Sequence, residues 1–97
     1  MERITLDAYV IDALMPDLVG HDRRASAFIV YLYLWRRTRG GARAAVVSHQ
    51  QIADATGLVR RSVQHAFVVL ERRRLIVSTR GSKTAASSVR LTLDWRD

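Results

Sequence analysis

The sequence predicts an α+β domain that is mostly helical and ends in a β-hairpin. Apolar residues recur at helical spacing, every third or fourth position, through residue 74, whereas apolar and polar residues alternate over 75–93. The length agrees with this simple architecture, because a chain of 97 residues buries one modest core and has no room for a second. We therefore expect one domain over residues 1–97.

Two scaffold helices are expected in the N-terminal part, over 6–15 and 22–38. In the first, the apolar side chains fall on one helical face: Leu6, Val10, Ile11 and Leu14. Pro16 is expected to end this helix, because a proline ring disfavours helical backbone at the residue before it. Asp22 is a candidate N-cap for the second helix, which should stop before Gly40 and Gly41.

The second helix is apolar on all sides between residues 28 and 35 and therefore needs cover all round. One face can fill the core: Phe28, Tyr31, Leu32 and Trp35. The other sides carry Ile29, Val30, Tyr33 and Leu34. Either the first helix and the C-terminus cover these residues, or Ile29, Tyr33 and Leu34 form a dimer interface.

Residues 48–74 predict two helices joined by a tight turn. Ser48 and Gln51 have the spacing of a capping box, in which the Ser hydroxyl accepts from a first-turn amide and the Gln side chain reaches back. A short helix then runs to about Thr56, and Gly57 supplies the positive φ that ends it. The longer helix, 59–74, begins at Val59, which has no side-chain cap to offer.

The longer helix has an apolar face and a polar face. Its apolar face consists of Val63, Ala66, Phe67 and Leu70. Its opposite face consists of Arg60, Arg61, Gln64, His65, Val68 and Arg72, and Val69 is also expected to be exposed. Arg can bond guanine O6 and N7, and Gln can bond adenine N6 and N7, in the major groove of DNA. This face therefore has the chemistry needed to read base edges.

The alternating segment 75–93 predicts two strands around a polar tip. Arg80 and Lys83 would place positive charge near that tip, where DNA phosphates or a minor groove could be contacted. Val46 and Val47, just before the two helices, are expected to add a short third strand.

Several residues of this region follow a recognisable pattern: Ser48, Ile52, Ala53, Thr56, Gly57, Leu58, Ser62, Val63, Ala66, Phe67, Leu70, Leu75 and Ile76. Residues 46–93 thereby resemble the bacterial winged helix-turn-helix superfamily. The upstream helix ending in YLYLW also looks like small transcriptional regulators and the DNA-binding domains of plasmid replication initiators. The resemblance implies that helix 59–74 enters the major groove and that the hairpin, the wing, touches the DNA backbone. Val59 departs from the pattern, which commonly has a capping Ser or Asp there.

Charge is distributed unevenly along the chain. The formal charge is +7, from 16 basic and 9 acidic residues, and Lys83 is the only lysine. Residues 1–22 hold five acids and one base (−4), 23–57 six bases and one acid (+5), and 58–83 seven bases and one acid (+6). This arrangement indicates either an arginine-rich solvated surface or a binding face for an anionic polymer.

Other classes of function find little support in the sequence. The absence of cysteine excludes disulfides and thiolate metal sites, and the three histidines are too scattered for a metal site. We expect no cofactor, no small-molecule ligand and no enzyme activity. The longest apolar run has eight residues, 28–35, against roughly 20 for a membrane span, so we expect a cytoplasmic protein.

The sequence thus predicts a protein that binds double-stranded DNA sequence-specifically, as a homodimeric transcriptional regulator. The residues expected to contact DNA are Ser48, Arg60, Arg61, Ser62, Gln64, His65, Arg72, Arg80 and Lys83. Two alternatives stay open: a replication or partition initiator that binds origin repeats, and a protein-interaction adaptor that uses the apolar 28–35 helix. The operator, the regulated genes and any effector do not follow from the sequence.

Overall fold

The computed structural model describes residues 1–80 and 86–96, of Arg80 only the backbone. The described chain is α+β, which confirms the predicted class. Its elements follow in the order η1 (Val10–Leu14), η2 (Pro16–His21), α1 (Ala25–Arg37), β1 (Ala45–Ser48), α2 (His49–Thr56), α3 (Arg60–Arg72), β2 (Ile76–Arg80) and β3 (Ala86–Leu91).

The strands form one antiparallel sheet in the order β1-β3-β2. The hairpin expected at 75–93 pairs β2 with β3, with Ile76 opposite Leu91, and β1 pairs with the other edge of β3, with Ala45 opposite Val89. Val89 and Leu91 point inward and are buried, as their alternation with polar residues predicts. The third strand expected at Val46 and Val47 is confirmed.

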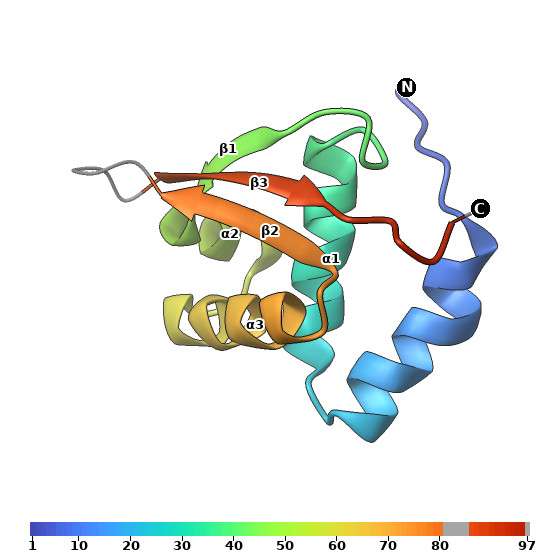
Figure 1. Cartoon of the computed structure of the whole chain (residues 1–97). Coiled ribbons are helices and arrows are strands. Elements are labelled where there is room, and N and C mark those ends of the chain that lie inside the picture. Colours follow the sequence, from blue (N-terminus) through green and yellow to red (C-terminus); the bar gives the residue numbers. More distant parts are fainter. Residues whose placement is uncertain (81–85, 97) are drawn as a thin grey trace.

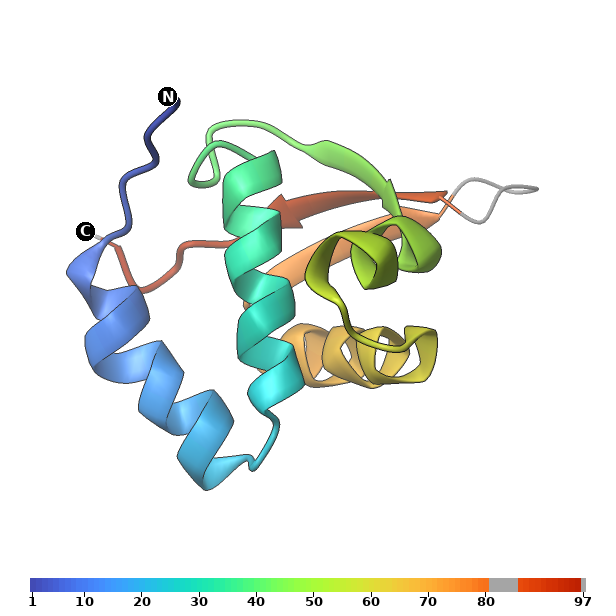
Figure 2. The same cartoon turned by 180° about the vertical axis from the view of Figure 1, so that it is seen from behind.

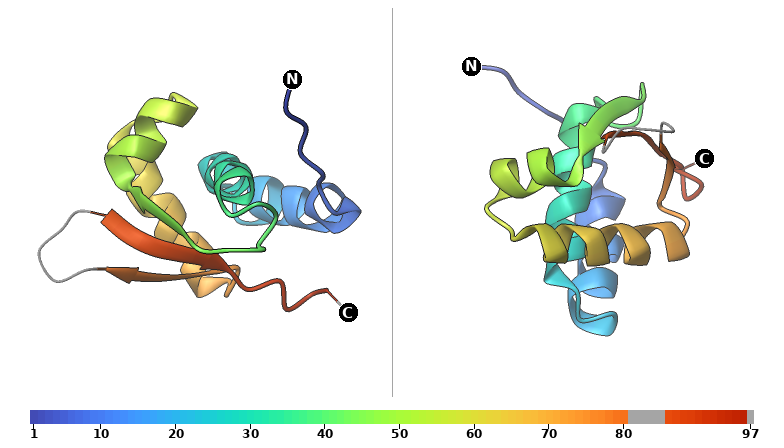
Figure 3. Two further views of the ribbon diagram at one scale, coloured as in Figure 1. Left: turned by 90° about the horizontal axis from the view of Figure 1, so that it is seen from above. Right: turned by 90° about the vertical axis from the view of Figure 1, so that its left-hand side faces the viewer.

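Helix α1 lies in the middle of the molecule (Figures 1 and 2). The N-terminal segment, η1 and η2, packs on one side of it, and α2 and α3 lie on the other side. Seen from above, α1, α2 and α3 all lie over the same face of the sheet (Figure 3, left). Because α1 contacts η2, α2, α3 and β3, most of its apolar surface is covered by the chain itself.

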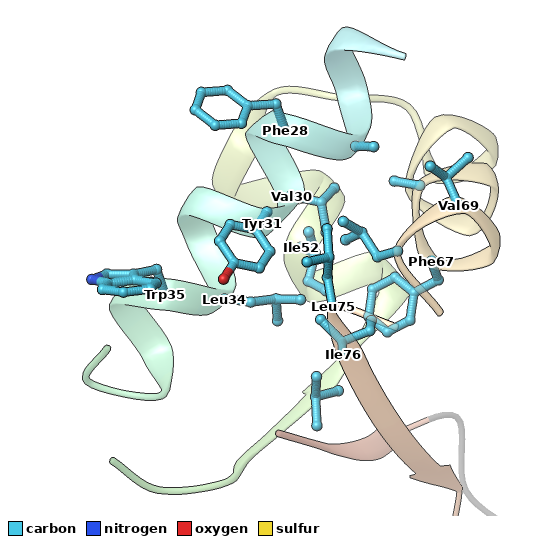
Figure 4. Packing of buried hydrophobic residues seen from close by; sticks show 14 of the residues in the cluster. Phe28, Val30, Tyr31, Leu34, Trp35, Ile52, Phe67, Val69, Leu75 and Ile76 are labelled. Carbon is cyan, nitrogen blue, oxygen red and sulfur yellow. The ribbon is translucent and has the colours of Figure 1, made fainter. Parts of the chain in front are cut away.

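The core gathers residues from every layer. Val30 and Leu34 of α1 meet Ile52 of α2, Phe67 of α3 and Ile76 of β2 (Figure 4). Burying a side chain of this size contributes roughly 1.5–3 kcal/mol, so these contacts are what orient α3 against the rest of the domain.

A second packing centre joins the two ends of the chain. The Trp95 ring stacks on Tyr9 at a centroid distance of 4.7 Å and on Trp35 at 6.4 Å. The indole N–H of Trp35 donates to the backbone carbonyl of Thr5 at 2.8 Å. Tyr31 lies beside Trp35, fully buried, and its burial raises the pKa of its hydroxyl to about 12. The C-terminal residues are thus fixed against the N-terminal segment and α1.

The expected boundaries of the two scaffold helices, 6–15 and 22–38, are wrong in two places. Pro16 does not end the first helix; it occupies the first position of η2, and the chain stays helical to His21. Met15, directly before Pro16, keeps helical backbone angles (φ −60°, ψ −55°), so the usual preference of a residue before proline for extended backbone is overridden here. Asp22 does not cap α1, which begins at Ala25 after Arg24 without a side-chain cap. The Asp22 carboxylate instead contacts Arg73 at the end of α3.

The longer of the two joined helices also differs from its expected form. It extends over Arg60–Arg72 and not to residue 74, because Arg74 takes a left-handed φ of 57° that turns the chain into β2. Val69, expected to be exposed, is 8% exposed. The buried arc of α3 is wider than one face, since the helix packs on both α1 and β2.

Candidate functional site

Local hydrogen bonds build the connection between α2 and α3. The Ser48 hydroxyl accepts from the Gln51 amide at 3.0 Å, and the Gln51 side chain accepts from the Ser48 amide at 2.8 Å. At the other end, Gly57 has a φ of 84° and its amide donates to the Ala53 carbonyl at 2.9 Å. The predicted capping box and the predicted glycine turn are both confirmed, and together they fix where α3 begins.

Helix α3 presents a continuous exposed surface. Its inward residues are Val63, Ala66, Phe67, Val69 and Leu70. Its exposed residues are Arg60, Arg61, Gln64, His65, Val68, Glu71 and Arg72. Within the described part of the chain, Arg60 and Arg61 form no ion pair, so their guanidinium groups are available to a ligand.

Helix α3 forms a ridge between two open grooves. The groove toward the sheet has a volume of about 450 Å³ and is lined by His49, Arg60, Gln64, Phe67, Val68, Glu71, Ser78 and Ser87. The groove on the opposite side, toward the start of α1, has a volume of about 430 Å³ and is lined by Asp22, Arg24, His65, Val68, Val69, Arg72 and Arg73. Val68 lines both grooves and therefore stands on the crest of the ridge.

The acidic N-terminal residues neutralise arginines elsewhere in the fold. Arg73, at the C-terminal end of α3, lies 3.0 Å from an Asp17 oxygen and 3.3 Å from an Asp22 oxygen. Two further ion pairs are brought together in the same way, Glu2 with Arg36 and Asp7 with Arg96. Four carboxylates of the N-terminal segment thus pair with arginines that lie away from the exposed start of α3: Glu2, Asp7, Asp17 and Asp22.

The predicted DNA-contacting residues fall into three groups. Arg60, Arg61, Gln64, His65 and Arg72 are exposed together on α3. Ser48 and Ser62 are half-buried, and the Ser48 hydroxyl is already engaged in the capping box. Of the two residues expected on the wing, Arg80 ends β2 with only its backbone described, and Lys83 lies outside the described residues.

The expected dimer interface is not a single exposed patch. Leu34 is fully buried inside the chain and offers no surface to a second copy. Tyr33 is half-buried, and its hydroxyl accepts from Arg37 at 2.8 Å. Ile29 alone is exposed, at 39%. The chain's own segments, η2, α2, α3 and β3, cover most of α1.

An exposed apolar stripe lies on the N-terminal segment, where the sequence analysis placed no function. It comprises Ile11, Met15 and Val19, each about two-fifths exposed. The spacing of four residues was visible in the sequence, but their outward direction depends on which face of the segment packs against α1.

Neither a metal site nor a membrane-spanning helix is found among the described residues. In residues 1–80 and 86–96, no group of three or more His, Cys, Asp or Glu side chains is placed to hold a metal ion. None of the helices described is long and apolar enough to cross a membrane.

Comparison with known proteins adds no relative. No family model, no curated protein and no solved structure matches this chain.

Proposed function

We propose that this chain is a winged helix-turn-helix protein that binds double-stranded DNA in a sequence-specific manner. In this proposal α2 and α3 are the helix-turn-helix, β2 and β3 are the wing, and α3 lies in the major groove. The observation on which it rests is the exposed face of α3, where Arg60, Arg61, Gln64 and His65 stand together without a carboxylate partner among the described residues.

The shape of this region supports the proposal. An α-helix with its side chains is about 10–12 Å across, and the major groove of B-DNA is about 12 Å wide. A helix that enters the groove has one phosphate backbone on each side. The two grooves that flank α3 provide space for those backbones, with Arg60 in one and Arg24 and Arg72 in the other.

The distribution of charge supports it as well. The acidic N-terminal segment lies across α1 from α2 and α3 (Figure 1). The helices α2 and α3 and the ends of β2 and β3 that flank residues 81–85 lie on the opposite side of the molecule (Figure 1; Figure 3, right). DNA approaching from that side meets arginines and is kept away from most of the carboxylates, which favours association.

The biological role we propose is that of a transcriptional regulator acting as a homodimer in the cytoplasm. The exposed apolar stripe of Ile11, Met15 and Val19 favours contact with another protein surface. The same stripe also favours a second candidate function, a protein-interaction adaptor, although through the N-terminal segment and not through the 28–35 helix. A replication or partition initiator differs in its target, because it would protect repeated origin sequences in a footprint.

The test is selection of bound duplexes from a random library, followed by titration of the selected duplex. Arg60→Ala/Arg61→Ala removes two charges from α3, and Arg3→Ala/Arg43→Ala removes the same charge from exposed positions outside α3. We expect the first variant to lose at least tenfold in affinity and to flatten the salt dependence by about two units of log–log slope. The control variant should bind nearly as the wild type does.

Failure to select any duplex at low salt contradicts the proposal. Equal losses in the two variants contradict the role of α3, because they would show that only total charge matters. Binding of an unrelated protein together with no selected duplex would support the adaptor.

A further inference from the structure

The crest of α3 is apolar. Val68 is 55% exposed, and its neighbours one turn away in each direction on the helix surface are Gln64, His65, Glu71 and Arg72, all polar and exposed. The other apolar side chains of α3 are buried in the core. A valine that is more than half exposed gains little from burial within the fold, so packing alone does not explain this residue.

We propose that Val68 is a specificity-determining residue that contacts the 5-methyl group of a pyrimidine in the major groove. This inference rests on the proposed DNA binding by α3. The thymine methyl is the apolar feature that a base pair presents in the major groove, and aliphatic side chains recognise it. Val68 lines both of the protein grooves that flank α3 and therefore stands on the crest of the helix. With α3 in the major groove of DNA, Val68 reaches as far toward the base edges as any α3 side chain of its length.

The position of Gln64, one helical turn before Val68, indicates which base pair Val68 contacts. A side chain on a helix leans toward the N-terminal turn, so the methyl groups of Val68 lie over the turn that carries Gln64. Residues four apart are separated by about 6 Å along the helix, which is less than two base-pair steps of about 3.4 Å. Gln can bond the N6 and N7 atoms of adenine, whose partner is thymine. We therefore expect Gln64 and Val68 to read the same A·T pair or neighbouring pairs.

The test replaces each thymine of the selected duplex in turn with deoxyuridine, which lacks only the methyl group. We expect one replacement to weaken wild-type binding about fourfold, the effect of removing one buried methyl group. Val68→Ala should weaken binding to the thymine duplex by at least as much and should show no further loss on the deoxyuridine duplex. Val46→Ala, at an exposed valine on β1 outside the proposed wing, is the control and should keep the full sensitivity to deoxyuridine.

A second arm identifies the source of the methyl group. If the contacted base is cytosine in the selected duplex, replacing it with 5-methylcytosine should raise wild-type affinity and leave Val68→Ala unchanged. Restoring thymine at the sensitive position should restore wild-type binding in full.

Three outcomes overturn the inference while leaving DNA binding by α3 intact. The first is that the affinity of the wild-type protein for every deoxyuridine or 5-methylcytosine duplex stays within twofold of its affinity for the selected duplex. The second is a Val68→Ala variant that remains as sensitive to deoxyuridine as the wild type. The third is a Val68→Ala variant that binds normally. Loss of all duplex binding by the wild type would instead refute the proposed function itself.

Discussion

Two substitutions of Ser48 distinguish its contribution to the stability of the candidate site from its contact with DNA. Its hydroxyl accepts one hydrogen bond and its amide donates another in the capping box of α2. Ser48→Ala removes the first bond only, and the loss of such a cap costs about 1 kcal/mol, within a range of about 0.5–2 kcal/mol. The site is half-buried, so water replaces the lost partner in part and values near 1 kcal/mol are expected.

The assay is urea unfolding followed by circular dichroism. With a slope of about 2 kcal/mol per molar urea, a loss of 1 kcal/mol lowers the midpoint by about 0.5 M at unchanged slope. Gln51→Ala removes the reciprocal bond and should give a similar shift, whereas the double variant should lose less than the sum, because the two bonds belong to one unit. An unchanged urea midpoint in both single variants would refute the idea that the capping box stabilises the start of α2.

Ser48→Asp tests the other role of the same position. Aspartate is as good an N-cap as serine, so the unfolding midpoint should stay near that of the wild type. If Ser48 lies beside a phosphate, the added negative charge should weaken DNA binding about fivefold, the effect of about 1 kcal/mol of repulsion at 4 Å in water. A stable Ser48→Asp variant that binds with wild-type affinity would remove Ser48 from the contact surface.

Further predictions concern stability. Gly57→Ala should destabilise the fold by about 1 kcal/mol in urea unfolding, because the φ of 84° is strained for alanine although its Cβ meets no atom within 4 Å. Arg73→Ala should cost less than about 1 kcal/mol, since its ion pairs are partly exposed, and unlike Arg60→Ala/Arg61→Ala it should change DNA affinity little. Folding stability should fall by about 1.4 kcal/mol per pH unit between pH 10 and 12. In that range unfolded Tyr31 ionises while folded Tyr31, with its pKa raised to about 12, stays protonated, and Tyr31→Phe should abolish this component in pH-dependent unfolding.

Features set by neighbouring residues were predictable from the sequence. The capping box needs only Ser48 and Gln51, three positions apart, and the turn needs only a glycine at a left-handed φ at residue 57. The hairpin likewise follows from alternation within one short segment. For the same reason, the polar face of α3 was predicted with Arg60, Gln64 and His65 correctly exposed.

Features set by distant residues were not predictable in the same way. Asp22 has the chemistry of an N-cap, but Arg73, far along the chain, provides a partner that only the fold brings near. Leu34 is apolar on the outer side of α1 when that helix is considered alone, and it becomes interior because other segments surround the helix. Val69 is covered for the same reason. A helical wheel gives the direction of a side chain and does not say how many neighbours the helix has.

The stack that joins the two ends of the chain determines what intrinsic fluorescence can report. Trp35 and Trp95 are the only tryptophans, and both belong to that stack. Emission excited at the indole band will therefore follow detachment of the termini from α1, and a titration with duplex that leaves the stack intact will leave the emission nearly constant. A dye attached near Arg61 would be needed to follow occupancy of the α3 surface, and the two signals together would separate ligand binding from fraying of the ends.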